Sequence, residues 1–177
     1  MLFRIFPLAV IMLAVLGSPA MAQECPCCTS IHGQFDFWLG SWTVYDSLDQ
    51  EVGSNEIVKA QKECLLIENW SSVRGSTGTS YNYYDTSDST WNQLWIDDQG
   101  GILELKGSFI RGAMVLKSEL AKGKKVELYY NQITWSENKN GTVTQLWEVY
   151  DDSGKLLSTV FKGIYYRKLK SDDANGD

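Results

Sequence analysis

The segment Phe35-Asp36-Phe37-Trp38-Leu39-Gly40-Ser41-Trp42 indicates the fold class of this chain more clearly than any other stretch. It holds two Phe and two Trp around one Gly, and the alternating stretch Thr43-Val44-Tyr45 follows directly. Gly40 lets the chain turn tightly out of a short helical piece. Trp42 then offers a large apolar surface that can plug a barrel floor. The spacing Gly40-Ser41-Trp42 is typical of the first strand of small up-and-down β-barrels.

Turn residues divide the rest of the chain into short segments. All three prolines lie at or before Pro26, and the stretches between Gly, Asn, Asp and Ser clusters are rich in Trp, Tyr, Val, Ile and Thr. This composition is typical of strands. Asn140-Gly141 and Ser153-Gly154 are pairs favoured in hairpin turns. The pattern predicts ten strands, at 41–46, 52–60, 64–72, 78–84, 91–97, 102–110, 113–120, 125–136, 142–150 and 156–168.

Strands joined in series by short turns form an antiparallel meander. A meander this long must close or fold over to remove its edge strands. Because no long crossover connection is visible, we predict an all-β protein whose up-and-down meander closes into a barrel of about ten strands. Barrels of about eight to ten strands have room inside for a small ligand.

The two ends of the chain differ in composition from this domain. A basic start at Arg4, an apolar run over 5–16 and the small-residue site Ala20-Met21-Ala22 predict a signal peptide at 1–22. The run is too short for a good transmembrane helix. We therefore expect a periplasmic or secreted protein with no stable membrane anchor after cleavage. A Cys-rich segment (23–33), a barrel domain (34–170) and an acidic tail (171–177) would follow.

The charge balance excludes several partners. The chain of 177 residues carries 16 Lys and Arg against 22 Asp and Glu, a net charge of −6. Nucleic-acid binding requires a basic face, so no nucleic-acid partner is predicted. Docking on an anionic membrane is disfavoured for the same reason. We expect a monomer or weak dimer whose partner is a small molecule.

Four cysteines bear on the redox state of the chain. Cysteines of exported proteins are usually paired. Cys25, Cys27 and Cys28 crowd together, and Cys64 lies in the body of the chain. A bond between the adjacent Cys27 and Cys28 would be strained. We expect one of the three, with Cys28 favoured, to bond to Cys64. The alternative is a metal site completed by Cys64 and His32, but oxidation of the thiols disfavours it, and no metal is predicted.

A short repeat in the sequence indicates an interior cavity. Gln93-Leu94-Trp95 recurs as Gln145-Leu146-Trp147, and strand alternation puts Gln and Trp of each copy on one face. Such a face suits a lined cavity, since buried amides need hydrogen-bond partners. The alternative is an outward Gln beside a tightly packed Trp. The predicted ligand-binding residues are Trp70, Asn82, Tyr84, Gln93, Trp95, Met114, Trp135, Gln145 and Trp147.

Several motifs together resemble a known family. The first is the aromatic segment 35–42 described at the start. The others are Glu68-Asn69-Trp70, Gly78-Thr79-Ser80-Tyr81-Asn82, Trp91-Asn92-Gln93-Leu94-Trp95-Ile96-Asp97, Gln145-Leu146-Trp147-Glu148 and Phe161-Lys162-Gly163-Ile164-Tyr165-Tyr166-Arg167. They look like those of an uncharacterised family of exported bacterial proteins related to the nitrobindin and lipocalin-like barrels of the calycin group. The resemblance covers residues 34–168. It implies a β-barrel with a central cavity, and no established activity.

The resemblance also implies one structural contact and one departure. An Arg on the last strand of calycins stacks on the G-x-W tryptophan, which matches Arg167 and Trp42 here. Nitrobindins hold haem through a late His, and this chain has no His after His32. Tyr165 or Tyr166 could ligate iron in principle, but a structural role is expected of both, so haem is disfavoured and no cofactor is predicted.

The sequence contains no recognisable catalytic motif. Neither a Gly-x-Ser-x-Gly elbow nor a phosphate or dinucleotide loop is present. Glu68, Asp97 and Glu148 are the best carboxylate candidates. The leading hypothesis is a barrel that binds a small, mostly apolar ligand. The alternatives are a hydrolase or isomerase of the same fold that uses Glu68 or Glu148 as general acid or base, and a packed structural or interaction module without a ligand.

Overall fold

The computed structural model describes residues 25–124 and 126–168, so the predicted signal peptide and acidic tail lie outside it. In the described part, no helix is long and apolar enough to cross a membrane. One short 3₁₀ helix precedes a series of strands. These are η1 (Asp36–Trp38), β1 (Gly40–Tyr45), β2 (Glu51–Ala60), β3 (Leu65–Ser72), β4 (Thr77–Asp85), β5 (Thr90–Asp97), β6 (Ile102–Ile110), β7 (Ala113–Lys117), β8 (Ala121–Lys122), β9 (Leu128–Glu137), β10 (Val143–Asp151) and β11 (Leu156–Arg167).

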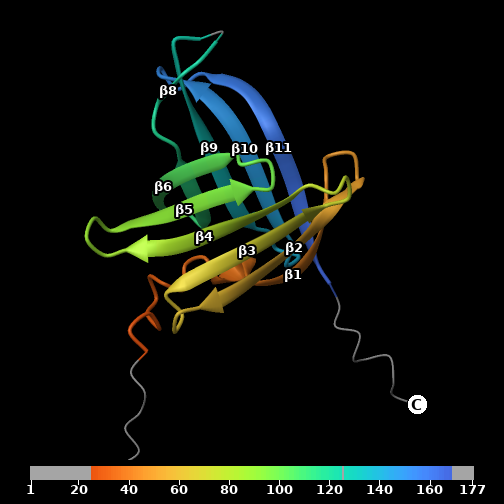
Figure 1. Cartoon of the computed structure of the whole chain (residues 1–177). Coiled ribbons are helices and arrows are strands. Elements are labelled where there is room, and N and C mark those ends of the chain that lie inside the picture. The colour runs from red at the N-terminus through yellow and green to blue at the C-terminus, as the bar shows by residue number, and fades with distance from the viewer. Residues whose placement is uncertain (1–24, 125, 169–177) are drawn as a thin grey trace, which may run out of the picture.

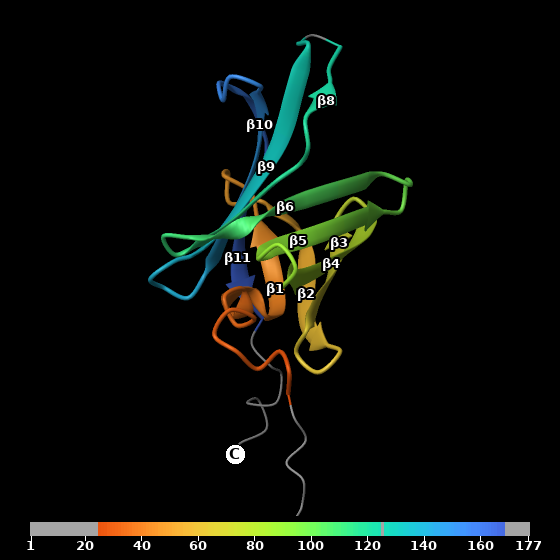
Figure 2. The ribbon, with the colours of Figure 1, turned by 90° about the vertical axis from the view of Figure 1, so that its left-hand side faces the viewer.

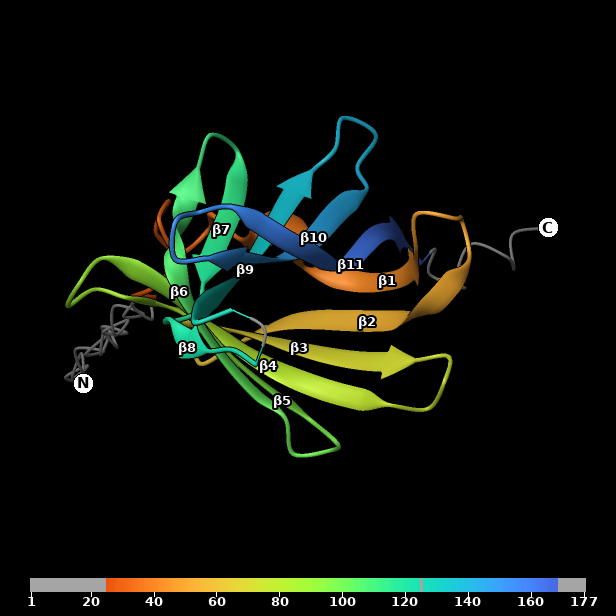
Figure 3. The same ribbon diagram turned by 90° about the horizontal axis from the view of Figure 1, so that it is seen from above.

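Ten of these strands form a closed antiparallel barrel. Each strand from β1 to β6 pairs with the next, β7 pairs with β9, and the ring closes through β9–β10, β10–β11 and β11–β1. From above, β1 to β4 run side by side (Figure 3). The short β8 pairs with β9 outside the ring, and the hairpins that contain β9 and β10 extend beyond the other strands (Figure 2). The predicted barrel of about ten strands is confirmed.

One predicted strand is too long. The stretch 113–120 was expected to form a single strand, but β7 ends at Lys117. The reason is Ser118, whose side-chain hydroxyl accepts a hydrogen bond from the backbone N–H of Asn131 at 2.9 Å. This bond takes the place of a ladder bond. The predicted strand 125–136 also starts too early, since β9 begins at Leu128.

Aromatic side chains from the N-terminal segment fill one end of the barrel, which we call the plugged end (lower end in Figure 1). Phe35, Trp38 and Trp42 are fully buried there. The rings of Phe35 and Trp38 stack with their centroids 4.9 Å apart, and the Trp42 indole N–H donates to the Trp38 carbonyl at 2.9 Å. The aromatic segment therefore supplies much of the core at this end.

Arg167 closes the plugged end from outside. Its guanidinium carbon lies 4.3 Å from the centroid of the Trp42 ring, and Nη1 donates to the Leu39 carbonyl at 2.9 Å. Gly40 has φ +122°, and a Cβ there would lie 2.6 Å from Arg167 Nη1. The chain thus needs Gly40 both for its backbone conformation and for the approach of Arg167. A cation–π contact at an exposed site is worth about 0.5–1 kcal/mol.

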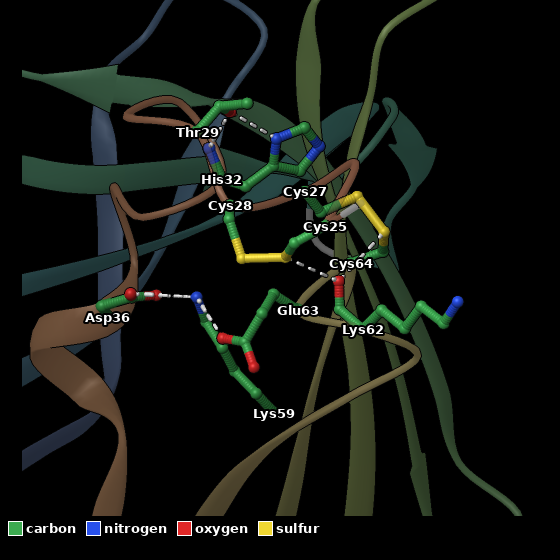
Figure 4. Close-up of a disulfide and its surroundings, with 10 residues drawn as sticks. All are labelled: Cys25, Cys27, Cys28, Thr29, His32, Asp36, Lys59, Lys62, Glu63 and Cys64. Carbon is green, nitrogen blue, oxygen red and sulfur yellow. Dashed lines mark hydrogen bonds and ion pairs between the residues drawn. A yellow bond between two sulfur atoms is a disulfide. The ribbon is translucent and has the colours of Figure 1, made fainter. Parts of the chain in front are cut away.

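One disulfide ties the N-terminal segment to the barrel, and a second lies within that segment (Figure 4). Cys27 bonds to Cys64 and Cys25 bonds to Cys28. The predicted bond between Cys64 and an N-terminal cysteine is confirmed, but Cys28 as its partner is wrong. A turn in which the Cys28 N–H donates to the Cys25 carbonyl brings these two Cα atoms within 5.3 Å, a usual disulfide separation. No cysteine of the described chain is free, so the alternative metal site is wrong as well.

Polar contacts add to this attachment. Lys59 Nζ lies 2.8 Å from Asp36 Oδ1 and 3.2 Å from Glu63 Oε2, which joins the N-terminal segment to β2 and the turn after it (Figure 4). His32 is only 7% exposed. Its Nδ1 lies 2.7 Å from Thr29 Oγ1, and its ring meets the Tyr84 ring edge to face. His32 is therefore a packed side chain of the plugged end.

Candidate functional site

A cavity of about 310 Å³ occupies the interior of the barrel beyond the plugged end. Three kinds of side chain line it, and each kind has a separate position. Four aromatic rings form its walls, from β3, β5, β10 and β11: Trp70, Trp95, Trp147 and Phe161. We call these four residues the aromatic wall.

Glycines and one hydrogen bond hold the aromatic wall in position. A Cβ at Gly78 would lie 2.2 Å from the Trp95 ring, and a Cβ at Gly53 would lie 2.6 Å from the Trp70 ring. Both indoles therefore lie flat on glycine backbone, which no other residue allows at this distance. The Trp147 indole N–H donates to Asn131 Oδ1 at 2.9 Å. These contacts hold the three indole rings of the aromatic wall in place.

The second set of lining residues is polar, and we call it the polar floor: Glu68, Gln93, Gln145 and Tyr165. Glu68 is only 5% exposed and lies in a row with Ser80 and Trp95 across β3, β4 and β5. The Asn55 amide donates to Glu68 Oε1 at 2.6 Å, and the Ser80 hydroxyl donates to Oε2 at 2.6 Å. Both carboxylate oxygens are therefore held in place.

Hydrogen bonds link the polar floor to the buried polar groups around it. The Gln93 amide donates to Asn82 Oδ1 at 2.7 Å, and the Asn82 amide donates to the Ser80 hydroxyl at 2.8 Å. On the other side of the barrel, the Tyr165 hydroxyl donates to the Gln145 amide oxygen. These hydrogen bonds lie in a low-dielectric interior, where an unpaired polar group is costly.

Burial changes the acidity of two groups of the floor. It raises the pKa of Glu68 to about 7, against the hydrogen bonds from Ser80 and Asn55, which lower it. Burial also raises the pKa of Tyr165 well above its ordinary value. At neutral pH, Tyr165 is a neutral phenol, whereas Glu68 exchanges readily between carboxylate and acid.

The third set is aliphatic, and one of its three members is exposed at the rim of the cavity. It comprises Leu103, Ile133 and Val160. Val160 is 51% exposed although it lines the cavity. The register between β10 and β11 shifts here, since Trp147 pairs with Phe161 and Glu148 with Thr159. This bulge leaves Val160 without a partner and lets it lie at the rim beside Phe161.

The predicted ligand-binding residues divide into two groups. Trp70, Gln93, Trp95, Gln145 and Trp147 line the cavity. The other four do not. Asn82 is fully buried behind Gln93, and Tyr84, Met114 and Trp135 pack in the core nearer the plugged end. They point inward as predicted, but at a level that other side chains fill.

The three carboxylate candidates, Glu68, Glu148 and Asp97, differ in whether they face the cavity. Glu68 lies on the polar floor. Glu148 does not line the cavity, because it follows Trp147 directly and faces the other way; it accepts a hydrogen bond from the Tyr150 hydroxyl at 2.8 Å. Asp97 accepts from the backbone N–H groups of Gln99 and Gly101 in the next turn. Of the three, only Glu68 is available to a molecule in the cavity.

Five lining residues were neither predicted ligand-binding positions nor carboxylate candidates: Leu103, Ile133, Val160, Phe161 and Tyr165. Alternation with Gly163 and Phe161 along β11 could have indicated Tyr165, and no sequence signal identifies Val160, since its inward position depends on the bulge.

A comparison of the chain with models of protein families finds no match, and a comparison with curated protein sequences also finds none.

Proposed function

We propose that this protein is an exported β-barrel that binds a small, mostly apolar ligand in its interior. The observation that carries the proposal is the cavity, with an aromatic wall above a polar floor. Ligand sites commonly combine apolar contact area with a few polar groups that orient the ligand. A volume of about 310 Å³ lies at the small end of the usual range for such sites.

Two further observations fit this proposal. Two disulfides are the mark of an oxidising compartment, which agrees with the predicted signal peptide. The relationship to nitrobindin and lipocalin-like barrels belongs to the same proposal, without haem. The single His of the chain packs against Tyr84 at the plugged end, so it is not a ligand for iron in the cavity.

A neutral fluorescent probe tests the binding site. N-phenyl-1-naphthylamine should bind the wild type saturably, with one probe per chain and increased fluorescence. Leu103→Trp should abolish this binding because the larger ring fills the cavity. Ile102→Trp is the matched control, since Ile102 is the neighbour of Leu103 in β6 and is 66% exposed. Absence of saturable binding, or equal binding by both variants, would contradict the proposal.

A second candidate function has one specific observation in its favour. The Glu68 carboxyl faces the cavity, and burial raises its pKa to about 7, which suits a general acid or base near neutral pH. Native mass spectrometry of protein from its own host would identify a retained molecule. If wild type changes that molecule chemically and Glu68→Gln does not, the barrel is an enzyme. If both release it unchanged, it is a binding protein.

A further inference from the structure

The aromatic wall and the polar floor together suit one class of ligand. We propose that the cavity binds a protonated organic amine, with the apolar body of the ligand among the four rings and its ammonium group on Glu68. This inference rests on the proposed function, because it requires that the cavity holds a ligand. It goes beyond that function in assigning a positive charge to the ligand.

The aromatic wall favours a cation over a neutral group. The face of an aromatic ring carries negative electrostatic potential, and tryptophan attracts cations most strongly of the aromatic side chains. Three of the four rings are Trp, and the Trp70 and Phe161 rings meet edge to face with centroids 6.3 Å apart. Because Gly53 and Gly78 support two of the indoles, the rings keep their positions whether or not the cavity is occupied.

The polar floor offers more acceptors than donors, because the Gln145 amide nitrogen is the one donor group on it for which the described residues supply no partner. Glu68 accepts one hydrogen bond at each oxygen, and each oxygen has a second lone pair. The Gln93 amide nitrogen is already bonded to Asn82, so its oxygen is the atom that remains for a ligand within the described part of the chain. An ammonium group has donors and no acceptor, and it therefore complements this floor better than a carboxylate or a carbonyl would.

The charges around the cavity point the same way. Among the described residues that line it, none is Lys, Arg or His, and Tyr165 is the only titratable group besides Glu68. A buried carboxylate without a positive partner is unfavourable, and a cationic ligand would supply that partner. An anionic ligand would meet Glu68 with no cation to offset it. The acidic net charge of the chain favours cations further.

Three ligands of nearly equal size test the charge requirement. Calorimetric titrations compare 2-phenylethylamine, 2-phenylethanol and phenylacetate at pH 8 and pH 5.5. At pH 8 the amine should bind about tenfold more tightly than the alcohol, and phenylacetate should bind most weakly. At pH 5.5 the amine remains charged while Glu68 is protonated, so the preference for the amine should largely disappear.

Variants connect this preference to Glu68. Glu68→Gln keeps the side-chain volume and should remove the preference for the amine. Glu148→Gln is the matched control, because Glu148 lies outside the cavity and should leave the preference unchanged. Trp95→Leu is a second variant that does not alter the buried polar network, and it should weaken binding of the amine more than binding of the alcohol.

The outcomes separate the two proposals. Equal affinities for amine and alcohol in the wild type, or a preference that survives Glu68→Gln, would overturn the amine assignment. The ligand-binding function would stand in that case if the neutral probe still binds and Leu103→Trp still blocks it. Failure of all three ligands and of the neutral probe would overturn both proposals.

Discussion

The two ends of the barrel use tryptophan in different ways. Four of the seven Trp residues are at most 1% exposed and belong to the core at the plugged end: Trp38, Trp42, Trp91 and Trp135. The other three are partly buried and surround the cavity: Trp70, Trp95 and Trp147. The same residue type is core at one end and cavity wall at the other. The difference arises because the N-terminal segment inserts its own rings into one end only.

A polar layer separates these two ends. Asn55, Glu68, Ser80, Asn82 and Gln93 are buried and hydrogen-bonded to one another between the plug and the aromatic wall. An apolar core would not require this layer, and burying it without partners would be costly. Its position at the base of the cavity fits the proposed role in ligand binding as well as a role in the fold.

The largest expected difference between the ends comes from removing one ring at each. Trp135→Ala should lower the free energy of unfolding by roughly 3–5 kcal/mol, because Trp135 is fully buried and packs against Phe35 and Trp38. Trp147→Ala should cost about 1–2 kcal/mol, since part of its ring faces the cavity. Urea denaturation followed by circular dichroism measures both. Equal losses would mean that the cavity end is packed as tightly as the plugged end.

Removing each disulfide in turn tests how strongly the N-terminal segment, which forms the plug, is attached to the barrel. Replacing Cys27 and Cys64 by Ser removes a bond with a sequence separation of 37, and the loop-entropy relation gives about 4 kcal/mol for such a bond. Replacing Cys25 and Cys28 by Ser opens a bond with a separation of 3, for which the same relation gives about 2 kcal/mol. Thermal unfolding of the two double variants tests this order. The reverse order would show that the short loop, and not the link to β2–β3, holds the plug.

The sequence predicted the barrel because most of its turns have a local signal. Arg111-Gly112 and Asn140-Gly141 mark hairpins where Gly112 has φ +86° and Gly141 has φ +78°, conformations that favour glycine. Strand β8 was missed because two residues carry no periodic pattern. The partner of Cys64 was missed because the choice between Cys27 and Cys28 depends on a turn in the N-terminal segment.

The site was predicted only in part, for a geometrical reason. Alternation along a strand predicts which side chains point inward. It correctly predicted that Gln93, Trp95, Gln145 and Trp147 face the interior. It does not give the height of a residue along the barrel. Met114 and Trp135 point inward too, but they lie at the height that Phe35 and Trp38 fill. That height depends on strand stagger and on the insertion of a distant segment.

The polar floor should make the stability of the protein depend on pH. Burial raises the pKa of Glu68 from 4.5 to about 7, so the folded state holds this proton more tightly than the unfolded state does. The resulting stabilisation is complete below about pH 4.5 and is lost as the pH rises through about 7, a change of about 3 kcal/mol. Urea denaturation of wild type and Glu68→Gln between these pH values isolates this contribution. Parallel curves for the two proteins would show that Glu68 is not the responsible group.

A small change at Gly78 bears most directly on the cavity end. In Gly78→Ala the new methyl group would lie 2.2 Å from the Trp95 ring, so the ring must move off the backbone and into the cavity. Overpacking of this kind costs typically 1–3 kcal/mol, and the displaced ring should weaken binding of N-phenyl-1-naphthylamine.

Gly33→Ala in the N-terminal segment is the control, because its methyl group would meet only ordinary contacts at 3.6 Å and should change neither property. Trp95→Leu added to Gly78→Ala should recover stability, since the smaller side chain leaves room for the methyl group. If Gly78→Ala lowers stability and leaves probe binding unchanged, the aromatic wall stabilises the barrel but does not contact the probe.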